Sequence, residues 1–299
     1  MENIVAEIQQ KKGIGAREKL SAYSELTKPR IAFLLVLTAA AGFYMGSDNG
    51  FNWTLFVNSM LGITLIAFGS ATLNQFIERD IDGLMERTAN RPLPTGKLSG
   101  REALVFGVLL CLAAEIYLAL SVNFLTAFLG LIVIVGYVLL YTPLKTRTSA
   151  STAIGAFPGA MPPLMGFTAA AGHITIGAWV MFAMLFLWQF PHFLAIAWMY
   201  REQYAKAGIL MLPVVEPAGK ITARQIVIFT VLLIPVSLAP FFLGIAGWIY
   251  LIGAIVLGAW FLYASIQAAR TKTIPQARKL LLVSVLYLPL IFALLVFNH

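Results

Sequence analysis

Long apolar runs alternate with short polar segments along the whole chain. Nine runs are long enough to cross a bilayer as helices, because a span needs about 20 predominantly apolar residues. Three of the connections between consecutive runs are very short, so we expect the helices that they join to be antiparallel neighbours. The pattern predicts an all-α polytopic membrane protein with nine transmembrane helices. The runs cover roughly 31–46, 53–79, 102–121, 123–142, 150–171, 175–199, 224–246, 247–269 and 278–297.

The composition agrees with this fold class. Of the 299 residues, 60% are hydrophobic and 11% are charged, whereas soluble domains carry about 25% charged residues. The chain therefore lacks the polar surface of a soluble domain, and a lipid bilayer is its expected environment. The net charge of +8 does not indicate nucleic acid as a partner, because here the position of the charges matters more than their sum. The single cysteine, Cys111, allows no internal disulfide.

The positive charges predict an orientation. All 21 Lys and Arg residues lie in polar segments that nine spans place on one side of the membrane. The positive-inside rule then puts the N-terminus in the cytoplasm and the C-terminus outside. We expect a multi-pass cell (plasma) membrane protein, with a cytoplasmic leader over 1–27 and one intramembrane domain over 28–299. The long loops lie on the cytoplasmic side, so the functional site is expected there.

The stretch N-Q-F-I-E-R-D-I-D gathers acidic side chains where the second span ends. We expect this helix to continue through Asp82 and to stop at Gly83. Asn74, Glu78 and Asp82 then recur every four residues and form one stripe, which Asp80 does not join unless the last turn unwinds. Carboxylates at a helix C-terminus are unfavourable without a nearby cation. Oxygen ligands without thiolate or histidine select a hard ion such as Mg²⁺.

Basic residues beside the stripe supply what a phosphate group requires. Arg87 and Arg91 follow it in the same loop, and Lys145 and Arg147 follow the fourth span. Arg holds phosphate oxygens bidentately, and Lys acts as a point charge. Glu202, after the sixth span, is the natural carboxylate for a second metal site. The alternative is a solvated face on which acids and bases simply pair, but the joint pattern favours a Mg²⁺–phosphate site.

Two features within the spans indicate a cavity. His192 lies in the middle of the sixth span, where a titratable group is a functional candidate, with a packing histidine as the alternative. G-A-F-P-G-A-M-P-P in the fifth span cannot form a regular helix, and broken helices at membrane depth lie against protein or line a cavity. We therefore expect a central cavity open to the cytoplasm, suited to a substrate with a diphosphate head and a hydrocarbon tail. Departure of the diphosphate creates an allylic cation, and a metal assists by neutralising the leaving group.

These motifs resemble a known family. N-Q-F-I-E-R-D-I-D-G-L-M-E-R-T-A-N-R-P-L-P is similar to the first acidic signature of the intramembrane UbiA-type prenyltransferases, which are all-helical with nine spans. Three stretches resemble the protohaem IX farnesyltransferase (haem O synthase) branch: D-I-D-G-L-M-E-R-T-A-N-R-P-L-P, Y-T-P-L-K-T-R-T-S-A-S-T-A-I-G-A-F-P-G-A-M-P-P-L-M-G and W-Q-F-P-H-F-L-A-I-A-W-M-Y-R-E-Q-Y. The resemblance covers about 28–295.

The resemblance implies transfer of a farnesyl group from farnesyl diphosphate to a vinyl carbon of haem B, assisted by Mg²⁺, with water adding to give a hydroxyethylfarnesyl side chain. It implies haem contact at His192, as axial ligand or propionate partner. The residues that it implies for metal binding are Asn74, Glu78, Asp80, Asp82 and Glu202, and those for the diphosphate are Arg87, Arg91, Lys145 and Arg147. Asn74, Glu78, Asp82 and Lys145 are the expected catalytic residues.

One departure and two alternatives remain. The wider family has several aspartates after the sixth span, whereas Y-R-E-Q-Y offers only Glu202, so one or two Mg²⁺ ions are both compatible with the sequence. A quinone-pathway prenyltransferase is disfavoured by this missing acidic motif. A cation or lipid transporter is disfavoured because the chain shows no repeated halves. A downstream haem-modifying enzyme or a terminal oxidase is the candidate recipient of the product.

Overall fold

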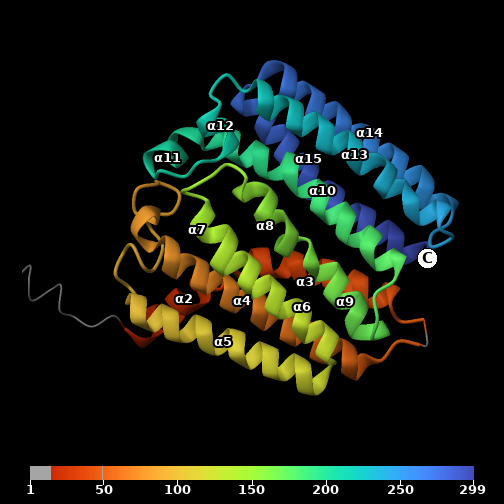
Figure 1. The fold of residues 1–299 in the computed structure, drawn as a ribbon, viewed down its shortest axis with the longest axis horizontal. Helices are drawn as coiled ribbons and strands as arrows, with labels where there is room; N and C mark the ends of the chain where they lie inside the picture. Colours follow the sequence, from red (N-terminus) through yellow and green to blue (C-terminus); the bar gives the residue numbers. More distant parts are fainter. Residues whose placement is uncertain (1–14, 49) are drawn as a thin grey trace, which may run out of the picture.

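The computed structural model describes residues 15–48 and 50–299, and every regular element in these ranges is a helix (Figure 1). The predicted all-α class is therefore confirmed. The elements are α2 (Ala16–Leu26), α3 (Pro29–Met45), α4 (Trp53–Asp82), α5 (Gly100–Ser121), α6 (Phe124–Ile134), the π-helix η1 (Val135–Tyr141), α7 (Thr142–Leu144), α8 (Ser151–Gly159), α9 (Met161–Ala171), α10 (Ile176–Met199), α11 (Arg201–Lys206), α12 (Leu212–Val215), α13 (Lys220–Phe242), α14 (Trp248–Thr271) and α15 (Ile274–Phe297).

The predicted apolar runs coincide with helices or with consecutive pairs of helices. By length and hydropathy, seven helices of the described chain can cross a membrane, or eight if the bent pair α2–α3 is one span. The chain is thus a polytopic membrane protein, while the predicted count of nine spans is not confirmed. Two runs account for the difference, because α3 has 17 residues and the fifth run is divided into α8 and α9.

Local sequence signals fix where the helices begin and end. The Asn52 side chain accepts a hydrogen bond from the Leu55 N–H at 3.0 Å ahead of α4, and Ser99 with Glu102 forms a capping box at the start of α5. These side chains pair backbone N–H groups that a helix leaves unsatisfied in its first turn. α4 ends at Asp82, as predicted, so its acidic residues lie in its last turns.

The prolines of the fifth run break its helix. Pro158 lies inside α8 near its end, α9 begins with Met161 followed by proline, and the helix stops between them at Ala160. Proline lacks the N–H of a helical hydrogen bond and its ring clashes with the preceding turn. The prediction that this segment cannot form a regular helix is therefore confirmed.

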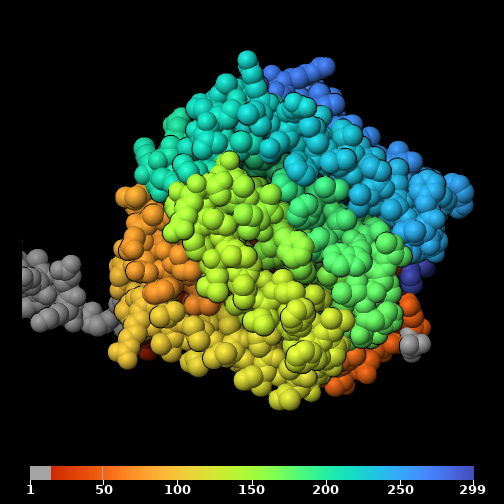
Figure 2. Space-filling model, in the orientation of Figure 1, coloured from red at the N-terminus to blue at the C-terminus, as the bar shows by residue number. Residues whose placement is uncertain are grey.

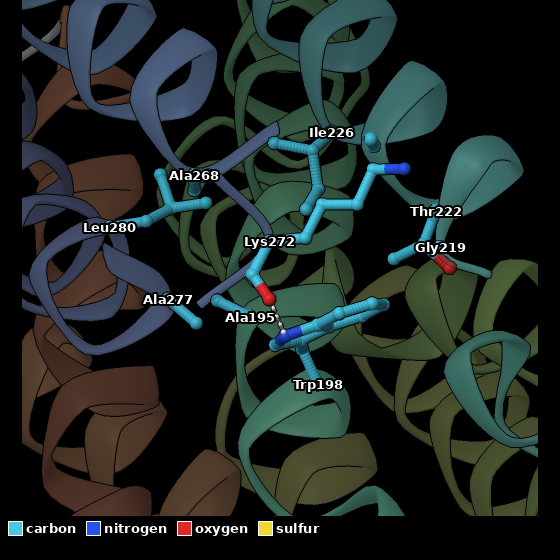
Figure 3. A pocket seen from close by; sticks show the side chains of 10 residues that line it. Ala195, Trp198, Gly219, Thr222, Ile226, Ala268, Lys272, Ala277 and Leu280 are labelled. Atoms are coloured by element: carbon cyan, nitrogen blue, oxygen red, sulfur yellow. Dashed lines mark hydrogen bonds between the residues drawn. The ribbon is translucent and has the colours of Figure 1, made fainter. Parts of the chain in front are cut away.

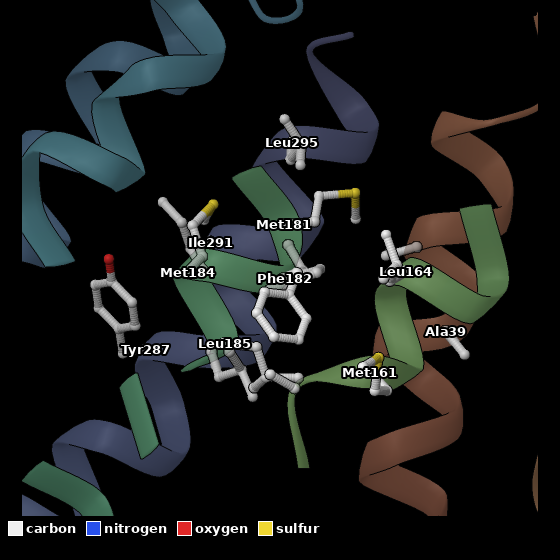
Figure 4. Packing of buried hydrophobic residues seen from close by; sticks show 14 of the residues in the cluster. Ala39, Met161, Leu164, Met181, Phe182, Met184, Leu185, Tyr287, Ile291 and Leu295 are labelled. Atoms are coloured by element: carbon white, nitrogen blue, oxygen red, sulfur yellow. The ribbon is translucent and has the colours of Figure 1, made fainter. Parts of the chain in front are cut away.

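The core lies where α3, α9, α10 and α15 meet (Figure 4). Leu164 of α9, Met184 of α10 and Ile291 of α15 are each 0% exposed. The outward face of α5 is also apolar, with Leu109 and Ile116 59% and 60% exposed. Exposed apolar surface of this kind marks contact with a partner or a membrane, and in a polytopic protein it faces lipid.

Contacts between the loops bring the positively charged segments to one end of the bundle, which carries α2, α7, α11 and α12 (Figure 1). The contacts that join these segments are Lys97–Glu18, Leu210–Lys145, Lys272–Ala218 and Arg87–Tyr204. In the space-filling view, side chains of α6, α8 and α9 (yellow-green to green) cover the centre of the face shown, with α13 (cyan) above them (Figure 2). The basic end of the bundle is where the candidate site lies.

The predicted leader over 1–27 is described only in its second half. Residues 1–14 lie outside the described residues, and the remainder forms α2 and the turn after it. Ala22 and Leu26 of α2 are buried in a cluster with Leu98 and Ala103. α2 therefore packs against the start of α5 and the loop before it.

Glycines allow α3 and α9 to approach closely. A methyl group on Gly166 of α9 would overlap the carbonyl oxygen of Ala39 on α3, and one on Gly42 would overlap the carbonyl of Pro163. Small residues are enriched where membrane helices touch, because they let the backbones come together. This contact holds α3, and with it the residues just before it, against the centre of the bundle.

We predict that Gly166→Ala lowers the melting temperature of the detergent-solubilised protein, because overpacking a tight interface costs about 1–3 kcal/mol. The matched control is Gly258→Ala in α14, where the nearest atom to the added methyl, Ile234 Cγ1, is 3.4 Å away. The control is expected to keep or raise the melting temperature, since alanine favours helix over glycine. Equal melting temperatures for the two variants would contradict the close approach.

Candidate active site

The last turns of α4 carry three buried polar side chains on one face. Asn74, Glu78 and Asp82 are 1%, 6% and 1% exposed. Their spacing of four residues places them one above another along the helix. The predicted stripe is therefore present in the structure, although its role in metal binding stays a prediction.

Each residue of the stripe contacts a basic side chain from another segment. Lys28 Nζ donates to Asn74 Oδ1 at 3.0 Å, and Lys145 Nζ donates to Glu78 Oε1 at 2.6 Å. Arg91 Nη1 donates to Asp82 Oδ2, also at 2.6 Å. Buried charges are stable only when they are paired and hydrogen-bonded. The cluster is thus a set of three base–oxygen contacts along one helix face.

Lys145 reaches Glu78 through an irregular stretch of helix. η1 is a π-helix that ends at Tyr141, and Lys145 follows the short α7. The Lys145 ammonium lies 4.5 Å from the centre of the Tyr141 ring, within the range of a cation–π contact. Thr142 connects this stretch to α4, since its hydroxyl donates to the Tyr137 carbonyl at 2.8 Å and accepts from the Asn74 amide at 3.1 Å.

Lys145 stays protonated in this environment. Burial is the largest single effect and acts to lower the pKa of its ammonium, but the charge and hydrogen bond of Glu78 together with Tyr141 and Tyr137 outweigh burial and raise the pKa above its ordinary value. The side chain is therefore a fixed positive charge at neutral pH. A fixed charge is what binding of a phosphate requires.

Lys28 is a site residue that was not predicted from the sequence, where it contributes only to the charge distribution that indicates membrane orientation. It lies between α2 and α3, which meet at 44°, and it adopts a left-handed backbone conformation with φ of 49°. Gln75, next to Asn74, donates to the Glu25 and Leu26 carbonyls at 3.3 and 3.0 Å and so holds the end of α2. The signal available in the sequence was a lysine directly before Pro29, just ahead of the first apolar run.

The loop after α4 brings Arg91 back onto Asp82. The Thr88 hydroxyl donates to the Asp82 carbonyl at 2.7 Å and so folds the loop against the helix end. Only one carboxylate oxygen of Asp82 is used by Arg91, because Oδ1 is buried and has no hydrogen-bond partner among the described residues. An unpartnered buried oxygen is costly, so this atom is available to a bound cation.

Four of the residues predicted to bind metal or diphosphate lie outside the cluster. The Asp80 side chain is 82% exposed and lies 3.6 Å from Arg79, because its position on the helix points away from the stripe. Glu202 and Arg147 are exposed. The Arg87 guanidinium lies over the Tyr200 ring at 5.0 Å. Within the described residues, no group of three or more His, Cys, Asp or Glu side chains is placed to hold a metal, so the predicted ligand set stays a prediction.

His192 lies elsewhere, in the middle of α10. Its Nδ1 is 2.8 Å from Ser284 Oγ on α15, and the Trp188 indole stacks on its ring with centroids 4.5 Å apart. A separate small cavity lies near the basic end of α10, between α13 and α14, where the Trp198 indole N–H donates to the Lys272 carbonyl (Figure 3). Its volume of about 10 Å³ is near the limit for one water molecule and far too small for a prenyl chain.

Fold and site together define a polytopic helical membrane protein with a buried cluster of bases and oxygen ligands at one end. The sequence profile of the UbiA prenyltransferase family matches residues 35–295. The chain is 51% identical to the protoheme IX farnesyltransferase of Solibacter usitatus, over 93% of this chain and 98% of that protein. It is 46% identical to the protoheme IX farnesyltransferase of Koribacter versatilis, over 95% of each. The chain belongs to the UbiA prenyltransferase family.

Solved structures share the fold. A structure from work on digeranylgeranylglyceryl phosphate synthase in membranes superposes with a TM-score of 0.77 at 20% identity, covering 94% of this chain and 98% of that one. A UbiA homologue from Archaeoglobus fulgidus, bound to DMAPP and Mg²⁺, superposes with a TM-score of 0.65 at 18% identity, covering 91% and 98%. At these identities the likeness shows the fold alone. Membership of this family of enzymes sets aside the transporter alternative.

We predict that Lys145→Met destabilises the protein by about 3–5 kcal/mol, because it leaves the Glu78 carboxylate buried without a partner. Glu78→Leu with Lys145→Met is expected to recover most of this loss, since it removes both charges. The measurement is thermal unfolding of the detergent-solubilised variants. Lys97→Met serves as the control: its pair with Glu18 is exposed and should contribute about 1 kcal/mol or less. A single variant as stable as the unchanged protein would argue against a buried pair.

Proposed function

We propose that the chain transfers a farnesyl group from farnesyl diphosphate to a vinyl group of protohaem IX (haem B), giving haem O. Relatives named protoheme IX farnesyltransferase, 51% and 46% identical over more than nine-tenths of the chain, support this substrate pair. The observation that carries the chemistry is the set of three basic side chains held on Asn74, Glu78 and Asp82. Bases and carboxylates at one buried point suit a diphosphate together with a hard metal ion.

In this proposal the bases exchange partners when substrate binds. Lys28, Arg91 and Lys145 leave the stripe and contact the diphosphate oxygens, with Arg bidentate and Lys as a point charge. Arg87 and Arg147, which lie outside the cluster, meet the diphosphate at the rim of the site. The positive charges favour departure of the diphosphate, because they stabilise the negative charge that develops on it.

The oxygens that the bases leave would hold Mg²⁺. Asn74, Glu78 and Asp82 supply only oxygen ligands, as a hard cation prefers, and the buried Asp82 Oδ1, which has no hydrogen-bond partner among the described residues, is a further ligand for such a cation. Solved UbiA homologues bound to DMAPP or GPP together with Mg²⁺ support the same choice of ion. The chemistry that Mg²⁺ supplies is neutralisation of the leaving group. Asp80 and Glu202 are not required for this set.

The proposed reaction has two parts: the farnesyl group is transferred from diphosphate to a vinyl carbon, and water is then added. The bond from farnesyl C1 to the diphosphate oxygen breaks, and a vinyl carbon of haem forms a bond to C1. Water then adds to the cation left beside the porphyrin and loses a proton, which gives the hydroxyethylfarnesyl side chain. His192 is the proposed haem contact, because it is the intramembrane histidine of the predicted set and its ring is held by α15.

The membrane placement is part of the proposal. Nine spans, with the N-terminus and the site in the cytoplasm, place all 21 Lys and Arg residues on one side. The gathering of the basic segments at one end of the bundle supports this orientation. Farnesyl diphosphate would then enter from the cytoplasm of the cell, with its chain in the apolar interior.

Membranes that contain the protein, given farnesyl diphosphate, Mg²⁺ and haem B, should produce a more hydrophobic haem that elutes later in reversed-phase chromatography. Glu78→Ala and Asp82→Ala should lower the rate at least about 100-fold, because each removes charge stabilisation of the leaving group. Glu86→Gln, in the same region but exposed, is the matched control and should keep the activity. Transfer to a hydroxybenzoate but not to haem would instead support the quinone-pathway alternative.

For Asp80, the sequence motif and the structure lead to different expectations. Because its side chain points away from the stripe, Asp80→Ala should keep a rate within a few-fold of the unchanged enzyme and the same dependence on Mg²⁺ concentration. The measurement is the rate of haem conversion over a Mg²⁺ series. A loss as large as that of Asp82→Ala would return Asp80 to the metal set.

A further inference from the structure

The His192 ring is fixed on one face and along one edge. Trp188, one turn earlier on α10, stacks on the imidazole with the two planes 22° apart. The Trp188 indole N–H donates to the Ser284 carbonyl at 2.8 Å, and the Ser284 hydroxyl oxygen lies 2.8 Å from His192 Nδ1. One residue of α15 therefore holds both aromatic rings.

The single proton of the Ser284 hydroxyl decides which ring nitrogen of His192 is protonated. Ser284 Oγ lies 2.7 Å from the Leu281 carbonyl oxygen, one turn earlier on α15. A carbonyl oxygen can only accept, so the hydroxyl proton lies in that contact. Ser284 Oγ must then accept from His192 Nδ1, which carries the ring proton. A neutral imidazole has one N–H, so Nε2 keeps a free lone pair.

The ring is neutral at this position. The ion pairs formed within the described part of the chain do not include His192. An unpaired charge in the middle of a membrane is costly. A neutral ring with Nδ1 already donating to Ser284 has no N–H left for a propionate. Of the two haem contacts considered for His192, the axial ligand is the one that this arrangement supports.

The direction of the His192 side chain follows from the contacts of its neighbours on α10. Trp188 contacts Ser284 on α15, and the Gln189 amide donates to the Ala156 carbonyl on α8 at 2.9 Å. At about 100° per residue, His192 projects about 40° from Trp188 toward Gln189. It therefore points between α15 and α8, into the bundle, and not to the face that packs on α13.

We propose that Ser284 is a positioning residue that holds His192 in its Nδ1–H form, so that Nε2 binds the iron of the haem substrate. This inference rests on the proposed function. Histidines that ligate a metal commonly donate their other ring N–H to an acceptor, which fixes the tautomer and raises the basicity of the ligand. Loss of such a partner lowers affinity about 10- to 100-fold.

The test is titration of the purified full chain in detergent micelles with ferric haem B, followed by Soret absorbance. Ser284→Ala should bind haem about 10- to 100-fold more weakly and should lose part of the nitrogen-ligand spectrum. Ser284→Thr keeps a hydroxyl and should restore both. The backbone carbonyl that accepts from Trp188 remains in each variant, so the packing of α10 on α15 is retained.

Two further variants serve as controls for the haem titration. Ser265→Ala removes an equally buried hydroxyl, which pairs with Thr230 at 2.8 Å, and should bind haem like the unchanged protein. His192→Ala should lose the nitrogen-ligand spectrum, and added imidazole should restore it. A loss in Ser265→Ala as large as in Ser284→Ala would assign both effects to packing and overturn the proposal.

The outcomes separate this inference from the proposed function. An unchanged affinity and spectrum in Ser284→Ala overturns the role of Ser284, even where farnesyl transfer to haem persists. An unchanged spectrum in His192→Ala overturns ligation by His192, again without affecting the reaction. If the unchanged protein neither binds haem nor farnesylates it, the proposed function fails, and this inference fails with it.

Discussion

A charge buried at the edge of a membrane must be paired, and the last turns of α4 depend on this constraint. Glu78 and Asp82 are nearly inaccessible, yet each contacts a cation at 2.6 Å. The partners come from the segment after η1 and from the loop after α4, so the same contacts fix how these segments lie against α4. The pairs that stabilise the protein are also the groups that a diphosphate and a hard cation would use. Structure and binding therefore share one set of contacts.

Two of the basic side chains in the cluster lie on irregular backbone. Lys28 lies in a left-handed conformation between two helices, and Lys145 follows a π-helix. Such departures from regular geometry cost free energy and are common at functional sites. At the break between α8 and α9, the Ala156 carbonyl accepts from the Ala160 N–H at 3.0 Å and from the Gln189 amide of α10 at 2.9 Å. Non-helical backbone inside a membrane persists where side chains satisfy its polar groups.

The sequence predicts what depends on local pattern. The all-helical class, the end of α4 at Asp82 and the broken fifth run follow from apolar run length, helical spacing and proline chemistry. The partners of the stripe do not, because Lys28 and Asn74 are 46 residues apart and nothing local connects them. The link between His192 and Ser284 spans 92 residues and was missed for the same reason. Asp80 is the opposite case, since the motif match implies a metal role for it while its exposed side chain points away from the stripe, and its role stays a prediction.

The central claim is that one cluster of bases and oxygens binds the diphosphate and Mg²⁺ together. Releasing the bases to a diphosphate leaves the carboxylates uncompensated, so each ligand should need the other. The direct measurement is calorimetric titration of the protein with the thiolo analogue of farnesyl diphosphate, with and without Mg²⁺. The account predicts that Mg²⁺ tightens binding of the analogue by about 5- to 150-fold, and that the analogue tightens binding of Mg²⁺ by the same factor. Equal affinity for the analogue in the presence and absence of Mg²⁺ would contradict it.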